Sequence, residues 1–221
     1  MHKDPSDIYP DYSTAERIAD GTMHLIGVVG SIIATCLLIS LVSSDGTRTD
    51  LTAVWLYCGT VIFAFIASAC YHMTPIEAYR PLFRRFDHAG IFLKIAGTYT
   101  PIVMLIGSHF SYTVLALVWV VALYGVTRRI FFWTAPNNNS TLLYMGLGWA
   151  SLALTWPMVQ TIPTNSFWLI ILGGLTYSFG VIFYKWENLK FSNAIWHVFV
   201  VVATLMFYIA IYIGEMAKQA V

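Results

Sequence analysis

The sequence predicts an all-α membrane protein, a seven-transmembrane-helix bundle that forms a single domain over residues 1–221. Two observations lead to this fold class. Hydrophobic residues make up 58% of the chain and charged residues only 10%, whereas soluble domains contain about 25% charged residues. Apolar runs long enough to cross a bilayer also recur along the whole chain, with short polar breaks between them. A soluble globular fold is excluded, because it would expose large apolar surfaces to water.

The seven helices are expected, in chain order, at about residues 22–43, 51–72, 87–106, 111–128, 140–158, 166–184 and 193–213. The breaks between them are rich in residues that end helices and form turns, such as SSDGTRTD after the first helix. Ahead of the first helix, Ser13 and Glu16 have the spacing of a capping box. We therefore expect a short interfacial helix over residues 13–21, preceded by a flexible tail at 1–12.

The basic residues predict the orientation of the bundle, because cytoplasmic loops carry more Lys and Arg than loops on the other side. One set of loops, with the N-terminal tail, holds Lys3, Arg17, Arg80, Arg84, Arg85, Arg128, Arg129, Lys185 and Lys190. The other set holds only Arg48 and Lys218, while Lys94 lies within the third helix. We expect a multi-pass protein of the cell's inner (plasma) membrane, with a cytoplasmic N-terminus and an outside C-terminus. The basic residues mark topology, so no nucleic-acid partner is expected, and nothing indicates an oligomeric state.

Polar residues gather at the predicted cytoplasmic ends of four helices. Ionisable groups inside membrane segments are energetically costly and usually functional. Here they come from the segment leading into the first helix and from the second, third and seventh helices: Glu16, Asp20, His24, His72, Asp87, His88, Asn193 and His197. The opposite ends offer only His109 and Glu215. Four-residue spacing places Glu16, Asp20 and His24 on one helix face.

Imidazole and carboxylate groups together suit zinc, which catalytic sites hold with three protein ligands and an open fourth position. His72 and His197 supply imidazoles and Asp87 a carboxylate, while Ser68 and Asn193 offer weaker oxygen donors. A water on such a metal becomes a nucleophile near neutral pH, and Asp87 can orient it or act as general base. The alternative is that each histidine only reaches to the interface or bonds a backbone carbonyl.

Three segments resemble the motifs of the hemolysin III family: SACYH at 68–72, FDHAGIFLKIAGTYTP at 86–101 and NAIWH at 193–197. The likeness covers nearly the whole chain and includes ERIADGTMHLIG at 16–27. This bacterial family belongs to the wider group of progestin and adipoQ receptors, which are related to alkaline ceramidases. The resemblance implies a seven-helix bundle with an intramembrane zinc ion near the cytoplasmic side.

By the family pattern, His72 and a His-x-x-x-His pair on the seventh helix bind zinc, with Asp87 and Ser68 around the metal-bound water. This sequence departs from the pattern at Asn193, where a histidine is expected. His72, His197 and Asn193 are thus the expected metal ligands, and Asp87 and Ser68 the expected catalytic residues. Because an amide oxygen is a weaker zinc ligand than imidazole, either an oxygen of Asn193 or Asp87 completes the site, or the site is degenerate. We expect zinc to bind more weakly than in an Asn193→His variant, or not at all.

The leading functional interpretation is a zinc-dependent, ceramidase-like hydrolase that takes a lipid-like substrate, a lipid amide or ester, from among the membrane lipids. It requires a cavity that reaches the metal and an open coordination position. The alternative is a non-catalytic sensor or receptor with a structural or degenerate metal site, closed by four protein ligands. A pore-forming hemolysin is disfavoured, because no polar stripe runs the length of any helix.

Lys94 is a further charged residue inside a predicted span. It lies two turns beyond Asp87 on the same face of the third helix, which is about 10 Å deeper by helix rise. Its ammonium either pairs with an internal partner such as Asp87 or bends back to the membrane surface.

Overall fold

A computed structural model describes residues 9–10, 12–45, 47–132, 138–186 and 188–220. Its elements, in which η denotes a short 3-10 helix, are α1 (Thr14–Asp45), α2 (Arg48–Met73), η2 (Glu77–Tyr79), α3 (Arg80–Ile106), α4 (His109–Phe131), α5 (Asn138–Trp149), η3 (Ala150–Leu154), α6 (Thr155–Thr161), α7 (Thr164–Lys185) and α8 (Ser192–Gln219). Together they provide 7 helical spans that are long and apolar enough to cross a membrane. The expected all-α, seven-span fold class is confirmed.

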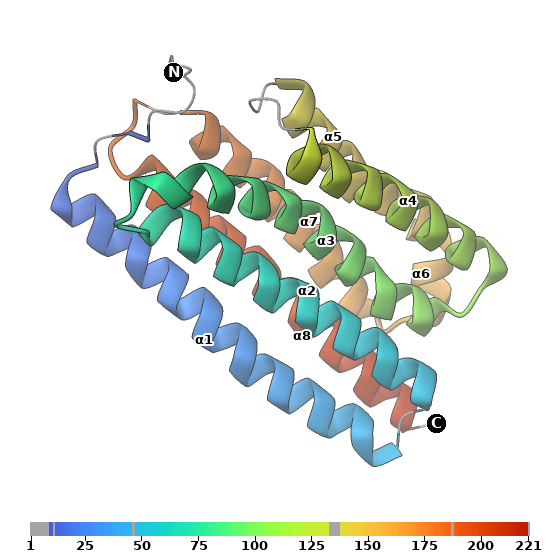
Figure 1. The fold of residues 1–221 in the computed structure, drawn as a ribbon. Coiled ribbons are helices and arrows are strands. Elements are labelled where there is room, and N and C mark those ends of the chain that lie inside the picture. Colours follow the sequence, from blue (N-terminus) through green and yellow to red (C-terminus); the bar gives the residue numbers. More distant parts are fainter. Residues whose placement is uncertain (1–8, 11, 46, 133–137, 187, 221) are drawn as a thin grey trace.

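The helices pack so that the last span lies beside the first. α1 packs against α2 and α8, α2 against α3, α3 against α4, and α7 against α8 (Figure 1). The start of α1 and the end of α8 lie at opposite ends of the bundle (Figure 1), as an odd number of crossings requires. Fully buried apolar side chains such as Leu38, Phe92 and Ile211 fill the interior, whereas Leu25 and Trp156 are exposed on its outer surface.

Glycines on α3 allow a close approach to α2. A Cβ added at Gly97 would overlap the side chain of Thr60, and one at Gly90 would lie 3.2 Å from the Cα of Ala64. Small residues at helix contacts let two backbones come together in this way. The approach brings the end of α2, which carries His72, close to the start of α3.

The segment 13–21, expected to form a separate interfacial helix, instead runs from residue 14 into the continuous helix α1. Its first turn has the expected capping contacts, because the backbone N–H and the hydroxyl of Ser13 donate to Glu16 Oε2 at 3.0 and 2.7 Å. No proline interrupts α1, and isolated glycines such as Gly21 are tolerated inside a long helix. The continuity carries Asp20 and His24 into the bundle. Most of the expected tail at 1–12 lies outside the described residues.

Other spans also differ from the expected boundaries, most notably α3 and the fifth span. α3 begins at Arg80 and not near residue 87, because Pro81 suits the first turn of a helix. The fifth span changes from α-helix to a 3-10 turn at Ala150 and resumes as α6. The hydroxyl of Tyr99 lies 2.7 Å from the carbonyl oxygen of Gly148 and 3.0 Å from that of Leu147. It therefore supplies a donor at the place where the helix changes pitch.

The orientation in the membrane stays a prediction, for which the charge distribution gives a test. We expect a reporter fused before residue 3 to report the cytoplasm and one fused after Lys218 to report the outside, because basic loops stay inside. Fusions of a phosphatase that is active only outside the cytoplasm and of a protein fluorescent only within it measure both ends. Finding both ends on one side would contradict the predicted topology.

Candidate metal centre

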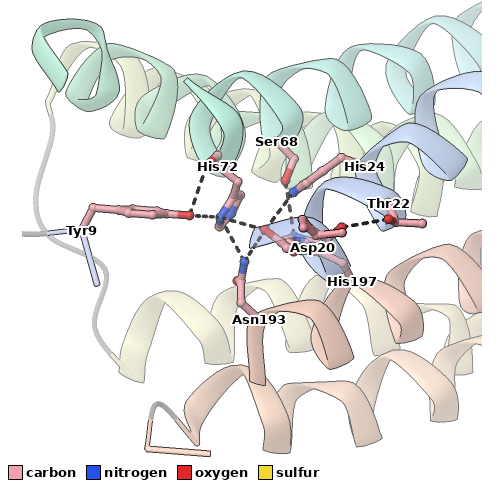
Figure 2. A network of polar contacts seen from close by, with 9 residues as sticks. Tyr9, Asp20, Thr22, His24, Ser68, His72, Asn193 and His197 are labelled. Atoms are coloured by element: carbon pink, nitrogen blue, oxygen red, sulfur yellow. Dashed lines mark hydrogen bonds and ion pairs between the residues drawn. The ribbon is translucent and has the colours of Figure 1, made fainter. Parts of the chain in front are cut away.

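Three buried histidines from three helices meet near the start of α1. His24 comes from α1, His72 from α2 and His197 from α8, and one ring nitrogen of each lies within 4.8 Å of the others. Figure 2 shows the rings turned toward one another, with the centroids of His24 and His197 4.3 Å apart. We call these residues the histidine cluster. Three imidazoles in one buried place are a donor set that zinc takes in catalytic sites.

Asp20 lies in the middle of the histidine cluster (Figure 2). Its Oδ1 is 2.6 Å from Nδ1 of His197, and its Oδ2 is 3.4 Å from Nε2 of His24. Because Nδ1 of His197 faces the carboxylate, its Nε2 points the other way, where the hydroxyl of Ser68 lies 3.5 Å from it. A carboxylate bonded to one imidazole nitrogen is the arrangement that orients the other nitrogen toward a metal.

The residues of the cluster fit a metal ion. Nε2 of His24 is buried and makes no hydrogen bond within the part of the chain that the structure describes, although Asp20 lies close to it. A buried polar atom without a partner costs about 1–3 kcal/mol, and coordination to a metal would supply the missing interaction. His24, His72 and His197 are therefore able to hold such an ion.

Asn193, expected as a third ligand, lies beside the cluster and turns its amide nitrogen toward it. Nδ2 lies 2.8 Å from Oδ2 of Asp20 and 3.1 Å from Nδ1 of His72. In this arrangement the amide donates hydrogen bonds that hold the carboxylate and the imidazole. The imidazole that the sequence lacks at position 193 has a counterpart in His24, which approaches from the opposite side on α1.

Sequence reasoning placed Asp20 and His24 on one face of a helix but assigned neither to the site. Their four-residue spacing was the available signal. The spacing does not show which helix packs against that face. In the structure, Glu16 Oε1 accepts a hydrogen bond of 3.0 Å from the backbone N–H of Phe191. This contact holds the start of α1 against the start of α8 and turns the face that carries Asp20 and His24 toward His197.

Tyr9, in the segment before α1, covers His72 from one side. Its hydroxyl is 3.1 Å from Nδ1 and 3.3 Å from the carbonyl oxygen of His72, and the guanidinium of Arg80 lies 3.9 Å above its ring. Burial raises the pKa of Tyr9, and the negative charge of Asp20 raises it further. The phenol therefore stays protonated at neutral pH and is able to donate a hydrogen bond to His72.

A cavity of about 1120 Å³ opens onto the histidine cluster between α2, α3, α5, α7 and α8. Near the cluster it is lined by His72, His197, Ser68 and Asp87, and farther in by apolar side chains that include Ile102, Leu154, Met158 and Ile170. Asp20 and His24 do not line it. The cluster thus has protein on the α1 side and open space on the other, as a site with a free coordination position requires.

Asp87 and Ser68, the expected catalytic residues, both line this cavity beside the cluster. His72, Asn193 and His197 line the same cavity. The structure therefore brings the five residues proposed from the sequence into one neighbourhood and adds Asp20 and His24 to them.

Comparison with known proteins agrees with this arrangement. A model of the family described as Haemolysin-III related matches residues 13–208. The chain belongs to the haemolysin-III related family. It is 34% identical over 197 residues to Hemolysin-3 of Bacillus cereus, covering 89% of this chain and 90% of that one. It is 32% identical over 190 residues to the Hemolysin-3 homolog of Bacillus subtilis (strain 168), covering 86% and 89%.

A more distant relative comes from animals. The human monocyte to macrophage differentiation factor is 26% identical to this haemolysin-III related protein over 208 residues, which cover 89% of this chain and 83% of that one. The family resemblance noted from the sequence is confirmed.

Substitution of Asn193 in two backgrounds tests whether residue 193 and His24 have the same role. We expect Asn193→His to strengthen zinc binding, because it adds an imidazole beside His72 and Asp20. The gain should be larger in a His24→Ala background, where the added ring replaces a lost one and does not add a fourth. Zinc titration of the wild type, both single variants and the double variant at one pH measures this. Equal gains in both backgrounds would show that His24 and residue 193 do not share a role.

Proposed function

We propose that this protein is a zinc-dependent hydrolase of the cell's inner (plasma) membrane that cleaves a lipid amide or ester. The observation that carries the proposal is the cavity of about 1120 Å³ that His72 and His197 of the histidine cluster line together with Asp87 and Ser68. The same cavity continues along apolar side chains into the bundle. A polar reaction centre at one end and an apolar channel beyond it match a substrate that has a polar linkage and an acyl chain.

Each residue has a distinct part in the proposed reaction. Zinc held by His24, His72 and His197 would supply a water that is nucleophilic at neutral pH. Asp87, on the cavity wall, accepts the proton of the attacking water and returns it to the leaving amine or alcohol. The hydroxyl of Ser68 positions the attacking water and the substrate through hydrogen bonds. Asp20 keeps His197 in the orientation in which Nε2 faces the cavity.

A non-catalytic sensor is the second candidate, and the position of Asp20 favours it. A carboxylate between three imidazoles can act as a fourth ligand, and four protein ligands close a zinc site and make it structural. In that case zinc holds α1 against α2 and α8, and a lipid in the cavity alters their packing. A pore is not proposed, although the Bacillus relatives are named hemolysins. The deeper wall of the cavity carries apolar side chains such as Leu154 and Met158.

One experiment separates hydrolase and sensor. The protein, purified in a neutral detergent, is assayed for zinc and for release of fatty acid from a long-chain N-acyl amine and from the matching acyl ester. A hydrolase releases acid, stops when a chelator removes zinc and resumes when zinc returns. A sensor contains zinc and loses thermal stability on chelation but releases no acid. Protein without zinc after purification and after dialysis against a zinc buffer would refute both.

A further inference from the structure

Lys94 places an ammonium group in the cavity, two helical turns deeper along α3 than Asp87. Its Nζ lies 4.6 Å from the ring centroid of Phe65 on α2 and 5.2 Å from that of Tyr177 on α7. Phe65 is two turns deeper than His72, just as Lys94 is two turns deeper than Asp87. The ammonium therefore neither pairs with Asp87 nor bends back to the surface, the two arrangements expected from the sequence.

The neighbours of this ammonium are aromatic rings. Within the described parts of the chain, the Lys94 ammonium has aromatic rings near it and makes no ion pair or hydrogen bond. Aromatic faces attract a cation, but they replace only part of the hydration that an ammonium loses inside a membrane protein. Charged residues at membrane depth usually face an internal cavity and mark a ligand pathway. Lys94 does line the cavity.

The surroundings of Lys94 indicate the kind of ligand. On one side, the cavity leads to the histidine cluster, and on the other it passes Ile102, Leu154 and Met158. Helix rise gives about 12 Å of α3 between Lys94 and Ile102, so an apolar chain can extend beyond the cation. We infer that the cavity binds a single-chain lipid anion, whose terminal oxyanion pairs with Lys94 and whose alkyl chain extends toward the apolar end. The oxyanion is the carboxylate of a fatty acid or the phosphate of a lysolipid.

This inference goes beyond the proposed hydrolysis and does not depend on it. A fatty acid is the class of product that cleavage of an acyl amide or ester would release, but its binding at Lys94 requires no metal and no reaction. Binding is therefore measured with zinc content recorded separately. Protein that binds the lipid anion but contains no zinc would count against the hydrolase alone. Protein that contains zinc but does not bind the lipid anion would count against the lipid-anion site alone.

The test is equilibrium binding to protein in phosphatidylcholine nanodiscs, with dodecanoate, dodecanol and lysophosphatidate as probes. We expect the wild type to bind dodecanoate or lysophosphatidate at least tenfold more tightly than dodecanol, since one ion pair of about 1.4 kcal/mol gives a factor of 10. Lys94→Met should abolish this preference and leave dodecanol unchanged, and Lys94→Arg should retain most of it. Lys190→Met, which removes the same charge from an exposed residue that does not line the cavity, should change nothing.

The ligand comparison decides the matter even without variants. Preference for dodecanoate assigns a carboxylate, and preference for lysophosphatidate assigns a phosphate. Equal binding of the anions and dodecanol to the wild type would overturn the inference. So would anion binding that survives in Lys94→Met, because the charge would then come from another residue.

Discussion

His24→Ala is expected to lose most of the zinc that purifies with the protein, to the same extent as His72→Ala and His197→Ala. Each change removes one of three imidazoles whose nitrogens lie within 4.8 Å of one another. Loss of even an outer partner of a metal ligand lowers affinity by about 10–100-fold, so loss of a ligand should lower it at least as much. Zinc per protein after dialysis against a metal buffer, together with the dissociation constant, measures the effect.

The matched control for these variants is His109→Ala. His109 begins α4 and is exposed, outside the histidine cluster, so its loss should leave zinc unchanged. Size-exclusion profiles and melting temperatures of all four variants separate loss of metal from loss of fold. If His24→Ala keeps its zinc while the other two cluster variants lose theirs, His24 is not a ligand. Asp20, Asn193 or Asp87 must then complete the site.

Asp87→Asn is expected to reduce hydrolysis of the lipid amide by about 10²–10⁴-fold, the usual contribution of a general acid or base. It should leave zinc content close to that of the wild type. The amide has nearly the same shape as the carboxylate but cannot accept the proton of the attacking water. Turnover per bound zinc, measured from released fatty acid, isolates this effect from any change in metal loading.

The outcomes for Asp87 are distinguishable. Ser68→Ala is the companion variant, because Ser68 lines the same cavity but carries no proton-accepting carboxylate, and its loss should be the smaller one. An Asp87→Asn protein without zinc would make the carboxylate a direct ligand. One with wild-type turnover would remove Asp87 from the reaction.

The fold was largely predictable because its elements are dictated locally. Twenty or so apolar residues must form a helix in a bilayer, where each backbone polar group has to be satisfied within its own segment. All seven spans follow from this rule. The boundaries were less predictable, since Pro81 starts a helix as readily as it ends one, and nothing local marks where the 3-10 turn begins at Ala150.

The site was predictable only in part, because helix faces meet through long-range packing. His72, His197 and Asp87 were assigned from their depth and from a family resemblance. The sequence placed His24 on one helix face with Glu16 and Asp20. The imidazole that it meets in the structure, His197 on α8, lies 173 positions away. No local pattern shows that α1 packs against α8. The contact between Tyr9 and His72 was missed for the same reason.

The order in which the helices are synthesised determines when the histidine cluster can form. His24 and His72 come from the first two spans and His197 from the last, so the three imidazoles cannot meet until the whole chain has been synthesised. A nascent or truncated chain has at most two of them. A metal held by all three imidazoles would therefore bind only after insertion of the final helix, and an occupied site would mark a polypeptide that has completed its assembly.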